Sequence, residues 1–228
     1  MSTEMPPTGR DGAPSSKVQI LATEHWSLLA TRSLTYTESL GRVNMFLGVL
    51  SGAVIALALV AQADRFGMTF ITVAIFMLTV VLFVGVATVA RLQTLNRDDY
   101  RWVIGMNRLR HAYLELHPEL ESHFVTSPHD DLPGALQTLG IDISGAQRLG
   151  SVRHGFQTLP GMLSVIVAAV AGAIGGLVAV ALSAPLYAVL LAGAAAFILA
   201  TVLMGIWGRG AVKRIDPGLK PRFWTPSP

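Results

Sequence analysis

The stretch from Phe66 to His117 constrains the fold of this chain most strongly, because it joins two helix signals without a break. Its first half is an apolar run of about 25 residues, long enough to cross a bilayer. Its second half repeats apolar residues at spacings of three and four and ends before Pro118. We therefore predict one helix that crosses a membrane and continues roughly 40 Å into water, at about 1.5 Å per residue.

The composition supports a polytopic membrane protein. Hydrophobic residues make up 52% of the chain and charged residues only 14%, which is far from the average of soluble proteins. The chain contains no cysteine, so disulfides and thiolate metal sites are excluded. Arginine greatly outnumbers lysine, a codon bias typical of GC-rich bacteria, and we expect the protein in a bacterial inner (plasma) membrane.

Four apolar runs predict four transmembrane helices arranged as two hairpins. The expected class is an all-α polytopic membrane protein, with a cytoplasmic antiparallel helical hairpin formed by extensions of the first two helices. The predicted segments, in chain order, are a disordered tail (1–16), a cytoplasmic helix (17–42), a first transmembrane hairpin (43–90), a cytoplasmic helix extension (91–118), a cytoplasmic loop with a short helix (119–160), a second transmembrane hairpin (161–207) and a basic tail (208–228).

The distribution of basic residues predicts the orientation. Lys and Arg residues near the ends of the spans gather on one side, and only Arg65 lies on the other, so the positive-inside rule places both termini in the cytoplasm. Because the basic residues flank the apolar runs, anionic lipid headgroups are the expected partners. Basic and aromatic residues do not interleave as on a nucleic-acid platform, and no nucleic-acid partner is expected.

Each of the two helix extensions carries a heptad stripe, so we predict that they pack on each other. The stripe on the first helix is Ala22, Trp26, Leu29, Ser33, Tyr36, Leu40 and Val43, and the stripe on the second is Leu92, Leu95, Asp99, Trp102, Met106, Leu109, Tyr113 and Leu116. A buried carboxylate needs a partner, and counting outward from the membrane places Asp99 beside Arg32 or Ser33. The alternative is a less buried stripe, with Asp99 facing water.

Small residues recur every four positions in two of the spans. Such faces let transmembrane helices approach closely. They pack either within one four-helix bundle or between subunits, and the second alternative is the main sequence support for a homo-oligomer. The residues are Gly48, Gly52 and Ala56 in the first span, and Ser164, Ala168, Gly172 and Gly176 in the third.

The spans contain no Asp, Glu, Lys, Arg or His, which argues against a proton-driven transporter. Histidines recur every six residues at His111, His117, His123 and His129, with acidic residues among them. That spacing puts His111 and His117 on different helix faces, so a solvated helix end is favoured over a metal site or a pH sensor. No catalytic or phosphate-binding motif occurs, and we expect neither an enzyme nor a cofactor.

Two stretches resemble small four-span membrane proteins of unknown function from actinobacteria: Leu21 to Leu29 (LATEHWSLL) and Gly105 to Tyr113 (GMNRLRHAY). The likeness covers about residues 20–205 and implies no activity. The order of soluble helix, membrane hairpin and long soluble helix over residues 17–117 is similar to that of SLATT-type effectors. This resemblance implies a membrane pore opened through a nucleotide-sensing partner, although the present chain adds a second hairpin.

The sequence therefore favours a non-enzymatic membrane module that self-associates, as a pore or a stress effector, through its cytoplasmic hairpin. The alternative is a monomeric scaffold or sensor whose hairpin docks a cytosolic protein. A third interpretation is a membrane-bound enzyme that uses the loop from His117 to Asp131.

Overall fold

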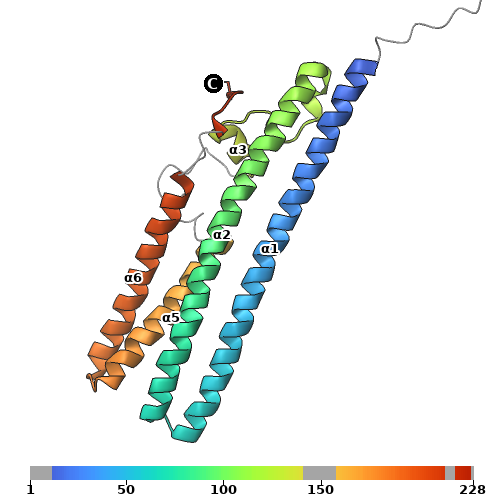
Figure 1. Ribbon diagram of the computed structural model, residues 1–228. Coiled ribbons are helices and arrows are strands. Elements are labelled where there is room, and N and C mark those ends of the chain that lie inside the picture. Colours follow the sequence, from blue (N-terminus) through green and yellow to red (C-terminus); the bar gives the residue numbers. More distant parts are fainter. Residues whose placement is uncertain (1–11, 141–157, 214–218, 227–228) are drawn as a thin grey trace, which may run out of the picture. The chain divides into compact units, whose positions relative to one another are not determined.

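The computed structural model describes residues 12–140, 158–213 and 219–226, and all the regular structure in these residues is helical. The four long helices are α1 (Gly12–Asp64), α2 (Met68–Leu116), α5 (Leu159–Ala181) and α6 (Leu186–Lys213) (Figure 1). Two short elements, η1 (Pro118–His123) and α3 (Leu132–Thr138), follow α2. The predicted all-α class is confirmed.

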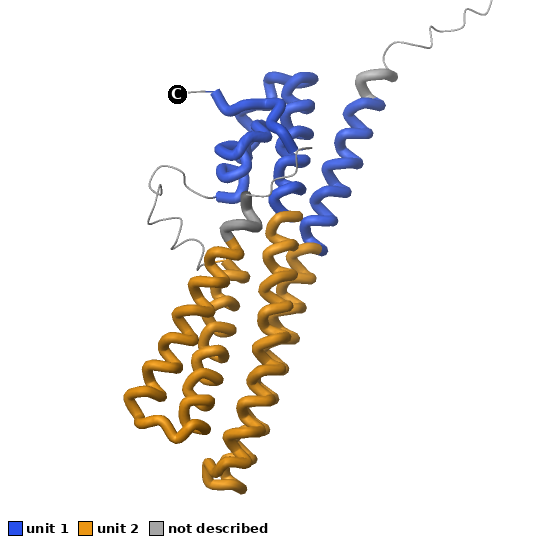
Figure 2. Tube along the Cα trace, turned by 60° about the vertical axis from the view of Figure 1, so that its left-hand side comes forward, with its two compact units in different colours: residues 1–34, 99–144, 216–228 blue, residues 35–98, 145–215 orange. Residues whose placement is uncertain are grey.

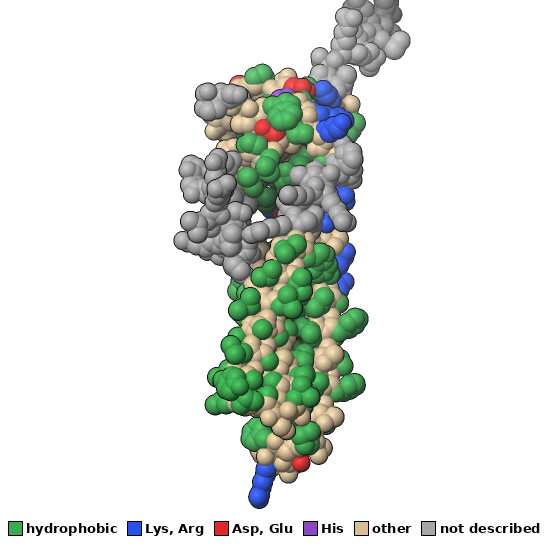
Figure 3. Space-filling model, turned by 90° about the vertical axis from the view of Figure 1, so that its left-hand side faces the viewer, with side chains coloured by type: hydrophobic (Ala, Val, Ile, Leu, Met, Phe, Trp, Pro, Cys, Tyr) green, Lys and Arg blue, Asp and Glu red, His purple; other side chains and the backbone are tan. Residues whose placement is uncertain are grey.

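All four long helices are long and apolar enough to cross a membrane. None of the residues in the apolar window of α6 is buried, and hydrophobic side chains cover most of the visible surface of these helices (Figure 3). Continuous exposed apolar surface of this extent is unfavourable in water and is normal against lipid. These are the features of a membrane protein.

The helix ends differ in part from the predicted boundaries. Helix α1 begins at Gly12, ahead of the expected start near Lys17, so the prediction of a disordered tail is wrong for residues 12–16. The rest of that tail, residues 1–11, lies outside the described residues, as do 141–157 of the predicted loop and 214–218 and 227–228 of the predicted basic tail. Helix α2 ends at Leu116, just before Pro118, because the residue that precedes a proline disfavours the helical conformation.

The turn between α1 and α2 is tight. Arg65 and Phe66 both adopt positive φ angles, 48° and 63°. The Asp64 carboxylate accepts a hydrogen bond of 2.7 Å from the Phe70 amide, which satisfies one of the free N–H groups at the start of α2. The hairpin is therefore closed by its own turn residues.

The chain divides into two compact units (Figure 2). Unit 1 comprises Met1–Leu34, Asp99–Ser144 and Asp216–Pro228, and unit 2 comprises Thr35–Asp98 and Gly145–Ile215. The long helices α1 and α2 contribute to both units.

Unit 2 contains most of the apolar stretches, and α2 supplies the largest share of its core. One side of α2 packs on α1 and another packs on α5, which lies side by side with α6 (Figure 1). The buried core residues are Phe46, Ala53 and Leu57 of α1, Ala74, Leu78, Val81, Val89, Leu92 and Leu95 of α2, and Leu163, Val167 and Val170 of α5.

Unit 1 has a smaller core on a face of α2 that the heptad stripe does not include. Val103 and Ile104 are almost completely buried, and Ala135 of α3 packs against them. Leu219 from the C-terminal segment also contacts this core. Residues 219–226 are therefore part of this folded unit and lie beside α3 (Figure 1).

Candidate functional site

Asp99 lies beside Arg32, the first of its two predicted partners. Arg32 Nε is 2.6 Å from Asp99 Oδ1, and Arg32 Nη2 is 3.4 Å from Oδ2. The two side chains are 32% and 27% exposed. This ion pair between α1 and α2 is thus half-buried, and Asp99 is directed toward α1.

The predicted stripe on the first helix is wrong by one residue. Trp26, Leu29 and Tyr36 are exposed, at 71%, 40% and 63% of their surface. The contacts with α2 in unit 1 come instead from residues one position earlier. His25 stacks on Tyr113 with ring centroids 6.0 Å apart, Leu28 lies against Gly105, and Arg32 pairs with Asp99.

The ion pair explains this difference. Neighbouring residues on a helix point about 100° apart, so α1 cannot direct both Arg32 and the Trp26 stripe at α2. An unpaired Asp99 between two helices is costly, and the orientation that provides Arg32 turns Trp26 and Leu29 outward. The predicted stripe was therefore compatible only with Ser33 as the partner of Asp99, and the structure has the other predicted partner, Arg32.

The predicted interface residues of α2 agree better with the structure. Met106 is buried at 4% exposure, and Trp102, Leu109 and Tyr113 are half-buried. Leu109 lines a shallow hollow together with Leu21 and neighbouring residues of α1. On α2 the stripe does face α1, and only α1 is rotated from its expected orientation.

We expect the Arg32–Asp99 pair to contribute a coupling free energy of up to about 1 kcal/mol, because both groups keep some contact with water. The measurement is a double-mutant cycle of Arg32→Ala and Asp99→Ala by denaturant titration in detergent micelles. Additive effects of the two changes would contradict this contact.

The two small-residue faces behave differently. Among the described residues, no atom lies within 4 Å of a Cβ atom added at Gly48 or Gly52 of α1, so this face is open there. At Gly172 of α5 the added atom would lie 3.1 Å from the Gly193 carbonyl oxygen of α6. Ala56 is half-buried, Ala168 is fully buried, and Gly176 is within 3.9 Å of Val189. The α5 face therefore packs within the chain.

The hydroxyl groups within the apolar helices bond to their own helix backbone. Thr72, Thr79 and Thr201 each donate to the carbonyl oxygen four residues earlier, at 2.7 to 2.9 Å. Thr88 and Ser164 do the same. These hydrogen bonds satisfy the hydroxyl donors locally, so none of the five marks a polar pathway by itself.

The four histidines have separate surroundings. His111 stacks on Phe223 at 3.7 Å, and its Nε2 is 3.8 Å from Glu115. The Nδ1 atom of His117 is 3.0 Å from Glu119. His123 contacts Ser122, and the Nδ1 atom of His129 is buried without a partner. Within the described residues, no three His, Asp or Glu side chains come together in a way that would hold a metal ion.

The most completely built polar site in unit 1 is one that the sequence reasoning missed. The Asp130 side chain is fully buried and accepts hydrogen bonds from two backbone amides of the C-terminal segment, Arg222 N at 2.8 Å and Phe223 N at 2.7 Å. Arg108 Nε donates to its other oxygen at 2.7 Å. The Asp130 amide in turn donates to the Phe223 carbonyl oxygen.

Asp131 continues this contact one residue further along. Its carboxylate accepts from the Thr225 amide at 2.9 Å and from the Thr225 hydroxyl at 2.7 Å. The same carboxylate caps α3 by accepting from Gly134 N at 3.0 Å. We name Asp130 and Asp131 the carboxylate clamp, and Leu219 to Pro226 the C-terminal tail.

The tail begins with a 3-10 residue at Leu219 and bends at Arg222 and Phe223, and its residues alternate in exposure. Leu219, Pro221, Phe223 and Thr225 are half-buried, whereas Lys220, Arg222, Trp224 and Pro226 are exposed. An alternation of period two is the pattern of an extended chain with one face on a surface. The inward residues contact the core of unit 1, His111 and the carboxylate clamp.

The hydrogen bonds decide the charge state of the clamp. Burial would raise the pKa of Asp130, but the Phe223 and Arg222 amides together with Arg108 outweigh it and lower that pKa below its ordinary value. Burial likewise opposes the Thr225 and Gly134 hydrogen bonds at Asp131, whose pKa is also lowered. Both carboxylates are therefore ionised at neutral pH and accept hydrogen bonds.

A buried amide positions the clamp. Asn107 of α2 is fully buried; its Nδ2 donates to the His129 carbonyl oxygen at 2.7 Å, and its Oδ1 accepts from Arg110 and Thr138. Gly134 allows α3 to approach this loop, because a Cβ there would lie 2.3 Å from the His129 carbonyl oxygen. Asn107 and α3 thus hold the loop from two sides, and these contacts fix the positions of the Asp130 and Asp131 carboxylates.

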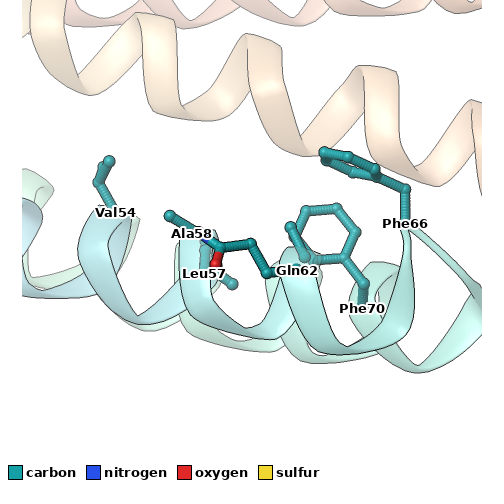
Figure 4. Close-up of a pocket in the computed structure, with 7 residues that line it drawn as sticks. Val54, Leu57, Ala58, Gln62, Phe66 and Phe70 are labelled. Carbon is teal, nitrogen blue, oxygen red and sulfur yellow. The ribbon is translucent and has the colours of Figure 1, made fainter.

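Unit 2 has one further feature near its α1–α2 turn, an open apolar hollow of about 430 Å³. Figure 4 shows its lining on α1 and on the turn, with Phe66 and Phe70 at one end. These two rings contact each other edge to face, with centroids 5.2 Å apart. Gln62 supplies the polar side chain of the hollow.

Comparisons of the chain with family models, curated proteins and solved structures gave no match. The function therefore has to be argued from the geometry described above.

Proposed function

We propose that this chain is a non-enzymatic module of a bacterial inner membrane that self-associates through its transmembrane helices. In this proposal, unit 1 faces the cytoplasm and serves assembly or sensing. The gathering of basic residues on one side of the spans supports that orientation. Assembly as a pore or a stress effector is the form that we favour.

One observation carries the proposal: the open face of α1 at Gly48 and Gly52. Nothing within the described chain lies within 4 Å of a Cβ atom placed at either glycine. A small-residue face on a membrane-spanning helix lets a second helix approach to backbone contact. The comparable face on α5 is already used, since Gly172 packs against Gly193 of α6. The α1 face is left for another copy.

Because the spans contain no ionisable residue, we do not expect such an assembly to relay protons or to couple transport to ions. Proton relays and ion-coupled transport use buried acidic, basic or histidine residues, and the spans contain none. A pore lined by several copies needs no such residue, because backbone carbonyls or hydroxyl groups line many channels. The proposal therefore requires an oligomer, and a single copy would not enclose a pore.

The exposed apolar residues of α1 in unit 1 favour a second function, a scaffold that docks a cytosolic protein. Ile20, Trp26 and Leu34 are each about 70% exposed, and large aromatic residues are common at the centre of protein interfaces. The enzyme alternative has less support, because both carboxylates of the loop it would use already bind the C-terminal tail.

The test is the mass of the protein in lipid nanodiscs, measured by mass photometry for the natural chain and for Gly48→Leu, Gly52→Leu. We expect an oligomer for the natural chain and a shift to monomers for the variant, because two Leu side chains prevent close helix approach. Gly205→Leu is the matched control, since Gly205 of α6 is also open, and it should leave the oligomer unchanged. A monomeric natural chain would reject self-association and favour the scaffold.

A further inference from the structure

The contact between the carboxylate clamp and the C-terminal tail has the features of peptide recognition. Three hydrogen bonds of the clamp, at Arg222, Phe223 and Thr225, come from backbone N–H groups of the tail. Recognition of an extended peptide commonly combines such main-chain hydrogen bonds with pockets for alternate side chains. The tail shows such main-chain hydrogen bonds, and every second one of its residues is half-buried.

Three inward side chains give this contact its selectivity. Leu219 packs on the core around Val103 and Ile104, and Phe223 stacks on the His111 ring at 3.7 Å. Thr225 adds a hydroxyl group that donates to Asp131. The outward side chains are dispensable by comparison, because Trp224 is 67% exposed and Arg222 is also exposed.

The clamp keeps its polar partners when the tail is absent. Asp130 retains the ion pair with Arg108 at 2.7 Å, and Asp131 retains its role as the cap of α3 through Gly134 N. A buried carboxylate that loses every partner is costly, whereas one that keeps a charged partner and gains water is tolerated. The tail is a single short segment in which only Leu219 is helical, and such a segment opens locally more readily than a long packed helix.

We propose that unit 1 is a peptide-binding unit, and that the C-terminal tail is its built-in and exchangeable ligand. The site takes an extended peptide with the inward pattern Leu-x-x-x-Phe-x-Thr, read through its backbone N–H groups. The same segment, added as a separate peptide, competes with the tail for the carboxylate clamp. This site does not depend on self-association.

The test uses the full chain in nanodiscs and a fluorescent peptide of residues 217–228. In the variant Phe223→Ala, Thr225→Ala the tail loses the ring contact with His111 and the hydroxyl bond to Asp131, so it binds the clamp more weakly while the clamp itself is unchanged. We expect saturable binding of the peptide to this variant and at least about tenfold weaker binding to the natural chain, where the tail competes. A peptide with the same two alanines is the matched control and should bind at least about tenfold more weakly than the natural peptide.

Hydrogen–deuterium exchange on the natural chain gives a second readout that needs no variant. We expect the tail amides to exchange faster than those around Val103 and Ile104, and excess peptide to accelerate exchange in the tail alone. The inference fails if the peptide does not bind the variant, if it binds the variant and the natural chain equally, or if the control peptide binds as well as the natural one. It also fails if tail and core amides exchange at one common rate, because the tail would then open only when unit 1 unfolds.

Discussion

Asn in place of Asp130 is expected to release the C-terminal tail and to destabilise unit 1. The Asn side chain lacks the negative charge that accepts hydrogen bonds from Arg108 and from the two tail amides. Its Nδ2 group is itself a donor and faces other donors. Replacing one partner of a buried, charge-assisted network costs about 2–4 kcal/mol. Limited trypsin digestion is the measurement, since the bond after Arg222 lies inside the docked tail, and its cleavage should accelerate at least about tenfold.

The control for this substitution is Glu121→Gln, which removes a carboxylate from the exposed η1 segment of the same unit. It should leave cleavage after Arg222 unchanged. Equal cleavage rates for Asp130→Asn and the natural chain would show that the clamp does not hold the tail.

Leu in place of Gly172 is expected to destabilise the packing of α5 on α6 by about 3 kcal/mol, because the added atoms meet backbone rather than flexible side chains. A Cβ there lies 3.1 Å from the Gly193 carbonyl oxygen and 3.2 Å from the Phe197 Cβ. The measurement is denaturant unfolding in detergent micelles, followed by circular dichroism.

The matched control is again Gly205→Leu, whose side chain enters open space on α6 and should change stability by less than about 0.5 kcal/mol. If Gly172→Leu unfolded like the natural chain and only reduced the oligomer mass, the α5 face would lie between subunits and the described α5–α6 packing would be contradicted.

Local pattern was enough to predict the main elements of the fold. The apolar runs and Pro118 lead directly to four long helices, and the single polar residue in a heptad stripe leads to the Arg32–Asp99 pair. Both predictions rest on rules that act within one helix or between neighbours in an antiparallel pair. They need no knowledge of distant contacts.

The rotation of α1 was predicted wrongly because two local rules disagree there. Aliphatic and aromatic residues mark one face, with Trp26 and Leu29, while Arg32 marks another about 100° away. Sequence periodicity counts the apolar residues and ignores the cost of an unpaired Asp99. The exposed stripe is thus the one that a hydrophobicity pattern selects, and the real contacts, at His25, Leu28 and Arg32, lie one position earlier.

No local sequence pattern indicated the carboxylate clamp. Asp131 caps α3, which begins at Leu132, and this local role gives no sign of a contact with the tail. The contact of Asp130 and Asp131 with the tail joins residues more than 90 positions apart in the chain. The tail contributes backbone N–H groups, which every residue except proline has. No pattern of residue types therefore predicts this contact.

The alternation of the docked tail has a consequence for its outer side. While the inward residues are held, Lys220, Arg222 and Trp224 are all exposed, two cations and an indole close together in the sequence. Once the tail leaves the clamp, free rotation about the backbone scatters these three groups. A molecule that contacts all three groups together therefore binds only while the clamp holds the tail, although it does not contact Asp130 or Asp131.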